Sequence, residues 1–179
     1  MPTYVSLLRG INVSGRNRIS MADLRALYEA HGHQDVSTYV QSGNVVSHSK
    51  VRSAAAVGRA IEQAISDDLG LDVTVLVRTP AQLAKLVDAN PLMGDRVDPT
   101  TLHVTFLAST PARAKVAALD GRRYAPDEFA VVGDVVYLVC PNGYGRTKIN
   151  NTYFERALGV GATTRNWKTV NQLLELGRR

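Results

Sequence analysis

The most constraining feature of the sequence is a succession of strand and helix signals that occurs twice. Alternating apolar residues, turn-forming residues and helix caps predict the order strand, helix, strand, strand, helix, strand in residues 1–90 and again in 101–179. In the first half we expect strands at 3–8, 36–41, 45–47 and 72–77 and helices at 20–31, 52–69 and 80–89. In the second half we expect strands at 102–107, 129–132, 135–139 and 160–164 and helices at 111–119, 151–158 and 167–176.

This order is typical of the ferredoxin-like fold. The sequence therefore predicts an α+β protein made of two ferredoxin-like halves, each followed by an extra helix, as a pseudo-duplicated unit. The predicted domains are 1–90 and 101–179, with 91–100 as a connector. Residue identity between the halves is negligible, so the evidence for a duplication is the order and spacing of the elements. Residues at corresponding positions in this order pair Val5, Gly43 and Val75 with Val104, Gly133 and Thr163. A single mixed α/β sheet is the alternative.

The composition fits a folded protein with localised positive charge. Of the 179 residues, 45% are hydrophobic and 21% are charged, which excludes the disordered class. Residues 1–140 contain 14 basic and 14 acidic residues, whereas 141–179 contain seven basic and two acidic residues, so the net charge of +5 belongs to the C-terminal segment. A smaller excess of positive charge lies near the N-terminus at Arg9, Arg16 and Arg18, because no acidic residue precedes Asp23.

Cysteine and histidine usage narrows the class of protein. The single cysteine, Cys140, cannot form an internal disulfide and suits the reducing cytoplasm, where we expect the protein to be located. The four histidines are scattered without metal-ligand spacing, so no metal site is expected. Residues 1–9 lack a signal-peptide pattern and no segment approaches the roughly 18 apolar residues of a membrane helix, so neither export nor membrane insertion is expected.

The strongest local chemistry lies in the segment 143–151, GYGRTKINN, which joins a predicted strand to a predicted helix. Glycines let a ligand approach the backbone, the helix start adds partial positive charge, and Arg146 and Lys148 can hold the oxygens of an anion. The segment matches neither nucleotide-binding fingerprint, because Lys148 replaces the third glycine of G-x-G-x-x-G and no P-loop motif occurs. The alternative is a hairpin exit loop with solvated charges and Asn150 or Asn151 as helix cap.

Two other strand-to-helix segments have similar chemistry. The segment TTRNWKT at 163–169 offers a guanidinium group, an amide and the face of the only tryptophan, although burial of that tryptophan in the core is the alternative. The segment RGINVSGRN at 9–17 again combines arginine, glycine and asparagine. We expect the three segments to line one rim of the sheets. The predicted ligand-binding residues are Arg9, Asn12, Arg146, Lys148, Asn151, Arg165, Asn166 and Trp167.

Several runs of the sequence carry a family resemblance. They are YVSLLRGINV at 4–13, YVQSGNVV at 39–46 and ATTRNWKTV at 162–170, with further matches at Met21, Leu24, 148–151, Glu155, Leu158, Gly159 and Leu173. These runs resemble the bacterial domain of unknown function 1697 (DUF1697) over almost the whole chain. The resemblance implies two α/β halves of ferredoxin-like type, and it implies no activity, cofactor or catalytic residue.

Two hypotheses on function follow from these observations. The favoured one is binding of a phosphate-bearing or other anionic ligand, with nucleic acid as one such partner, by the basic loops. The aromatic signature of an RNA-recognition strand is absent, because Tyr4, Tyr39 and Tyr137 occur singly. The alternative is a small-molecule enzyme or ligand sensor that acts on a phosphorylated or carboxylated metabolite in a pocket between the halves. No nucleophile with an adjacent base stands out, so the catalytic residues, any cofactor and the oligomeric state stay unassigned.

Overall fold

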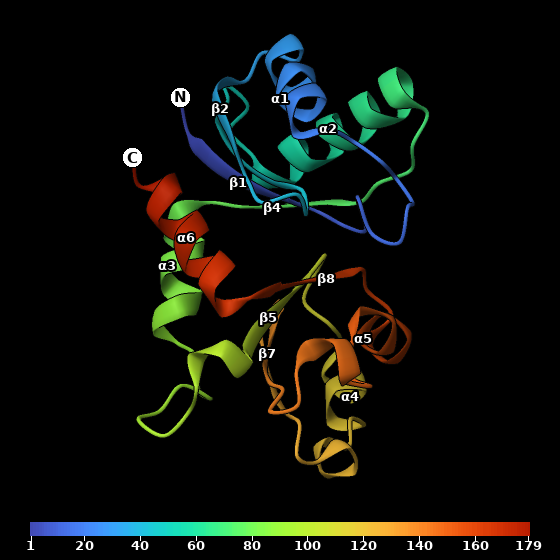
Figure 1. The fold of residues 1–179 in the computed structure, drawn as a ribbon, viewed down its shortest axis with the longest axis vertical. Helices are drawn as coiled ribbons and strands as arrows, with labels where there is room; N and C mark the ends of the chain where they lie inside the picture. Colours follow the sequence, from blue (N-terminus) through green and yellow to red (C-terminus); the bar gives the residue numbers. More distant parts are fainter. The chain divides into compact units, whose positions relative to one another are not determined.

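The computed structural model describes residues 1–179. It confirms the predicted α+β fold, in which the strand and helix order of a ferredoxin-like half occurs twice (Figure 1). The residues group into two compact units, Met1–Lys85 with Gln172–Arg179 and Leu86–Asn171. No helix in the fold combines the length and the apolar character needed to cross a lipid bilayer.

The first unit is built on an antiparallel sheet of four strands in the order β2-β3-β1-β4. The strands are β1 (Thr3–Leu8), β2 (Gln34–Tyr39), β3 (Asn44–His48) and β4 (Val75–Arg78), and the helices are α1 (Met21–Ala30), α2 (Ala54–Leu69) and the start of α3 (Pro80–Asp88). Leu8, Tyr28 and Ile61 belong to the core that α1 and α2 form with this sheet. Gly58 lets α2 approach β4 closely, because a Cβ atom there would lie 2.8 Å from the carbonyl oxygen of Val75.

The second unit repeats this architecture with the strand order β6-β7-β5-β8. The strands are β5 (Leu102–Leu107), β6 (Glu128–Val132), β7 (Val135–Val139) and β8 (Ala162–Asn166). The helices are α4 (Arg113–Ala117), α5 (Asn151–Leu158) and the start of α6 (Trp167–Gly177), whose remainder belongs to the first unit. The 3-10 turns are η1 (Pro99–Thr101), η2 (Gly121–Tyr124) and η3 (Tyr144–Arg146). Val136, Leu138, Phe154 and Leu158 form part of its core. The fold therefore contains two equivalent sheets, and the alternative of a single mixed sheet is wrong.

Several element boundaries differ from those predicted. The strands expected at 72–77 and 160–164 begin later, at Val75 and Ala162, because each can pair only as far as the last residue of its central neighbour, Leu8 or Leu107. The strand expected to reach residue 41 ends at Tyr39, because the next residue has a φ of +51° that breaks the ladder. The helix expected at 111–119 is reduced to α4, which has no side-chain cap at its N-terminus.

Candidate functional site

The second unit contains a cavity of about 460 Å³ beside the open end of the β6–β7 hairpin. Glu128 at the start of β6 pairs with Val139 at the end of β7, so the segments before β6 and after β7 must lie next to each other. These segments provide the two walls of the cavity. The lining residues are Arg123, Tyr124, Ala125, Pro126, Asp127, Asn142, Gly143, Arg146, Thr147 and Lys148.

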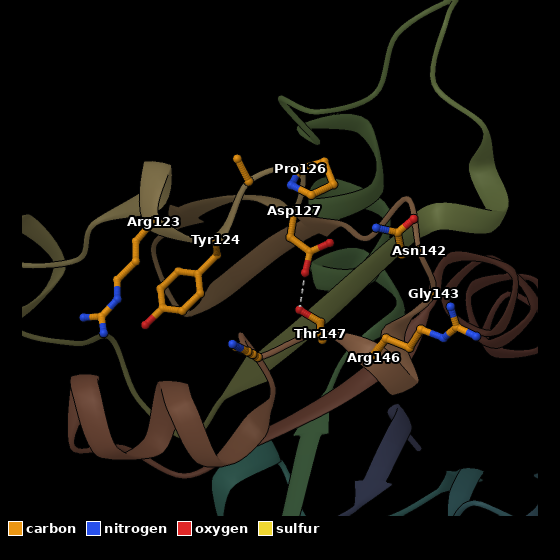
Figure 2. A pocket seen from close by; sticks show the side chains of 10 residues that line it. Arg123, Tyr124, Pro126, Asp127, Asn142, Gly143, Arg146 and Thr147 are labelled. Atoms are coloured by element: carbon orange, nitrogen blue, oxygen red, sulfur yellow. Dashed lines mark hydrogen bonds between the residues drawn. The ribbon is translucent and has the colours of Figure 1, made fainter.

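A short hydrogen bond connects the two walls. The Thr147 hydroxyl Oγ1 donates to Oδ2 of Asp127 over 2.6 Å and accepts from the Ile149 N–H over 3.2 Å. Figure 2 shows this pair in the middle of the cavity, with Arg123 on one side and Arg146 on the other. Asp127 is the only carboxylate in the lining, and one of its oxygens is therefore already used within the protein.

The cationic side chains of the cavity are not neutralised by the chain. Arg123, Arg146 and Lys148 are exposed, and none of them forms an ion pair. The guanidinium carbon of Arg123 lies 5.8 Å from the centre of the Tyr124 ring, close enough for a weak cation–π contact. Three cations and one hydrogen-bonded carboxylate make the cavity electropositive, which suits an anion carrying several oxygens.

The basic loop is held by contacts on both sides of its arginine. Gly143 has a φ of +88°, which a residue with a side chain adopts only with strain. The Tyr144 ring stacks on His103 of β5 with centroids 5.0 Å apart, and burial raises the pKa of its hydroxyl. Asn150 is the cap of α5, because its Oδ1 accepts from the Tyr153 N–H over 3.1 Å. Of the two helix caps that the sequence suggests, Asn150 and Asn151, the first is the cap.

The other predicted residues of the second unit do not line this cavity. Asn151 uses its Oδ1 to accept a 2.6 Å hydrogen bond from the Thr164 hydroxyl. Arg165 is buried, which lowers the pKa of its guanidinium to about 10, and its Nη1 donates to Oγ1 of Thr163 and to the Thr164 carbonyl. Each of these side chains thus has a structural task in β8 or beside it.

The residues at the start of α6 also have structural tasks. Asn166 is exposed and accepts from the Thr169 N–H over 2.8 Å, as a helix cap does. Trp167 is 7% exposed and belongs to the interior, as the core alternative anticipated. Neither residue contributes to the lining of the cavity.

The two predicted residues of the first unit line separate cavities there. Arg9 lines one of about 660 Å³, and Asn12 lines another of about 450 Å³. The Asn12 amide is extensively hydrogen-bonded: its Nδ2 donates to the carbonyls of Ile19 and Gln41 over 2.8 and 2.9 Å, and its Oδ1 accepts from the Ile19 N–H over 3.0 Å. Asn12 thus ties its loop to the β2–β3 turn. A common rim for all three loops stays a prediction.

Sequence reasoning missed half of the cavity of the second unit. Arg123, Tyr124 and Asp127 lie outside the segments that we singled out. The available signal was the run 122–127, RRYAPD, in which two arginines precede an Ala-Pro turn. Only the register of β6 against β7 shows that this run faces the basic loop.

The only thiol of the chain is not available as a nucleophile at the cavity. Cys140 is buried, and burial raises the pKa of its thiol to about 11, so the thiolate is scarce at neutral pH. No three His, Cys, Asp or Glu side chains come together in a group that could hold a metal ion.

Comparisons with known proteins give the family and the fold. A family model described as a protein of unknown function, DUF1697, matches residues 1–137. A solved structure, the conserved bacterial protein SP0830 from Streptococcus pneumoniae, is similar with a TM-score of 0.75 and 21% identity, over 98% of this chain and 98% of that chain. At this identity the likeness shows the fold alone, and no curated protein matches the chain. The chain belongs to the DUF1697 family.

Proposed function

We propose that the protein binds a small phosphate-bearing ligand in the cavity beside the β6–β7 hairpin. The observation that supports this is the meeting of three unpaired cations, Arg123, Arg146 and Lys148, at one cavity whose only carboxylate is hydrogen-bonded to Thr147. A phosphate monoester carries a charge of about −1.5 to −2 at neutral pH, which matches the excess of two positive charges. Guanidinium groups also offer paired donors that fit phosphate oxygens.

The size and the lining of the cavity favour a metabolite over a long polymer. A volume of about 460 Å³ lies within the range of small-ligand sites. The Tyr124 ring and the Asn142 amide add apolar surface and hydrogen-bonding capacity next to the cations.

The position of the tyrosines also argues for a small ligand over single-stranded nucleic acid. Tyr4 and Tyr137 are buried, and their hydroxyls donate 2.7 Å hydrogen bonds to the carbonyls of Val51 and Leu86. Proteins that bind single strands stack bases on exposed aromatic rings. These two strand tyrosines are unsuited to that task.

The alternative of a small-molecule enzyme has weaker support. Its most obvious nucleophile, Cys140, is buried with a raised thiol pKa, and Asp127 is engaged by Thr147. A ligand sensor would use the same binding step that we propose. The single unpaired thiol suits a reducing compartment, so we propose the cytoplasm as the setting.

The test is thermal unfolding with inorganic phosphate, pyrophosphate and a short oligothymidylate as probes, at constant ionic strength. A probe that binds only the folded protein stabilises it by about 2.7 kcal/mol at a hundred times its Kd. For a chain of this length we expect a rise in Tm of roughly 5–10 °C with pyrophosphate at that concentration. The double variant Arg146→Ala with Lys148→Ala should lose this rise.

A matched control carries the same loss of charge outside the cavity. Arg96 and Arg113 are exposed and form no ion pair, so their double replacement by alanine should keep the rise in Tm. An equal rise in the Arg146/Lys148 variant, or no rise with either phosphate probe at millimolar concentration, would overturn the proposal. Tighter binding of the oligothymidylate, with steep salt dependence, would replace the small ligand by nucleic acid.

A further inference from the structure

The loop between β1 and α1 in the first unit concentrates backbone strain. Five residues other than glycine have positive φ angles, and four of them lie in this loop or in the β2–β3 turn that Asn12 ties to it: Asn12 (+54°), Ser14 (+51°), Asn17 (+45°) and Val40 (+51°). Such conformations cost about 1–3 kcal/mol each and persist where the surrounding structure imposes them, frequently at binding sites.

The strain at two of these positions has an explanation within the fold. The Asn12 side chain makes three hydrogen bonds, and its N–H donates to the Asn17 carbonyl over 3.1 Å. Asn17 in turn donates from Nδ2 to the Gly10 carbonyl over 3.3 Å. Ser14 is different, because neither its hydroxyl nor its N–H makes a hydrogen bond within the chain. The fold holds Ser14 in a strained conformation with both polar groups free.

Ser14 lies on the wall of the cavity of about 660 Å³. The polar lining of this cavity consists of Arg9, Ser14, Arg16, Asn17, Asp72 and Thr74. Arg16 and Asp72 are exposed and line the same cavity, yet they form no ion pair with each other or with another residue. The β1–α1 loop therefore offers a cation and free donors at Ser14, and the segment before β4 offers a free carboxylate.

This combination indicates the chemical class of a ligand. An anionic group with several oxygens fits Arg16, the Ser14 hydroxyl and the Ser14 N–H. The Asp72 carboxylate would repel a second anionic group, but it can accept hydrogen bonds from sugar hydroxyls, as acidic residues do in ribose recognition. We propose that the cavity between the β1–α1 loop and Asp72 is a second site, which binds a sugar phosphate with the phosphate at Arg16 and Ser14 and a hydroxyl at Asp72.

The test is calorimetric titration of the full chain with ribose 5-phosphate, ribose and inorganic phosphate. We expect ribose 5-phosphate to bind more tightly than inorganic phosphate, and ribose alone to give no detectable heat. Arg16→Ala should weaken ribose 5-phosphate by about tenfold or more, because it removes a charged hydrogen bond. Asp72→Asn should weaken ribose 5-phosphate and leave inorganic phosphate unchanged or bound more tightly.

Two further variants separate this site from folding and from the cavity of the second unit. Ser14→Gly should fold at least as stably, since glycine adopts a positive φ without strain, yet bind ribose 5-phosphate several-fold more weakly. The Arg146/Lys148 variant and the exposed-helix control Arg59→Ala should both retain the binding that Arg16→Ala weakens. Ribose 5-phosphate binding that is absent, or that survives Arg16→Ala unchanged, overturns the second site. Equal affinity for ribose 5-phosphate and inorganic phosphate overturns the sugar contact at Asp72.

Discussion

Arg78 and Arg165 occupy the same position in their two sheets. Arg78 of β4 pairs with Val5 of β1, and Arg165 of β8 pairs with Val104 of β5. Each arginine is 8% exposed, and its Nη1 donates to the carbonyl of the residue before it, over 3.1 Å and 2.9 Å respectively. The two halves therefore share a buried arginine at one register position in addition to their strand order, which strengthens the case for a duplication.

The Asn12 amide should be a main support of the β1–α1 loop. Asn12→Ala removes three hydrogen bonds, each worth a net of about 1 kcal/mol, so we expect the free energy of unfolding to fall by about 2–3 kcal/mol in urea. Asn17→Ala is the matched control, because Asn17 also has a positive φ but contributes one side-chain hydrogen bond of 3.3 Å. Equal losses in the two variants would contradict the assigned role of Asn12.

Gly58 should be required by the close contact of α2 with β4. Alanine is favoured over glycine within a helix by about 1 kcal/mol, yet here its Cβ would lie 2.8 Å from the Val75 carbonyl oxygen. We expect Gly58→Ala to lower the free energy of unfolding by about 1–2 kcal/mol, since overpacking costs more than the helix propensity returns. Ser66→Ala, at an exposed position of the same helix, should be neutral or slightly stabilising. A stabilised Gly58→Ala protein would show that the helix shifts freely.

Two buried histidines should make the protein less stable in mild acid. Burial lowers the pKa of His33, which also faces His31, and lowers the pKa of His103. A lowered pKa in the folded state means that the unfolded chain takes up protons first as the pH falls below about 6.5, so stability decreases from there downward. Urea midpoints between pH 8 and pH 5 measure this. His33→Asn with His103→Asn should flatten the slope, and an unchanged slope would exclude these two groups as its source.

Cys140 should be inert in the native protein. Burial raises the pKa of its thiol to about 11, and a thiol reagent requires both the thiolate and access. We expect negligible labelling by a chromogenic disulfide reagent under native conditions and complete labelling in guanidinium. Fast native labelling at neutral pH would show that the strand end at Cys140 opens readily.

Val40 offers a route to a more stable protein. Its φ of +51° is costly for a β-branched residue, and its side chain is 51% exposed, so little packing compensates. Asparagine tolerates this conformation, and Val40→Asn should raise the free energy of unfolding by about 1 kcal/mol. Val51→Asn, at another exposed valine without a positive φ, should bring no such gain. Destabilisation by Val40→Asn would mean that the valine side chain has a role that its exposure conceals.

The order of the elements could be predicted because it depends on local patterns of apolar and turn-forming residues. The register could not, because it depends on which backbone groups pair. The predicted pair Val5 and Val104 is correct. The pair Val75 and Thr163 is wrong by one residue, because Val75 pairs with the last residue of its central strand, as Ala162 does in the second sheet. Gly43 is equivalent to Asp134, since each accepts the hydrogen bond from the last residue of the central strand. Turn glycines align poorly because a glycine can serve at different positions of a turn.

The residues of the candidate site also include some that the sequence predicts and some that only the register brings together. Arg146 and Lys148 stand out in the sequence, because glycines and a helix start surround them. Arg123 and Asp127 do not, because they reach the cavity only through the pairing of β6 with β7. Arg165 and Asn151 are predicted from the sequence as ligand-binding residues but do not line the cavity, because their side chains form hydrogen bonds with neighbouring threonines.

The strained loop of the first unit has a consequence for how this protein would respond to selection for heat resistance. Ser14 and Val40 lower stability through their backbone angles, and Ser14 gains no hydrogen bond within the chain in return. In a population screened only for survival at high temperature, substitutions to glycine or asparagine at these two positions should be among the first to spread. A lineage that kept both residues under such conditions would indicate that the loop is maintained for a task other than folding.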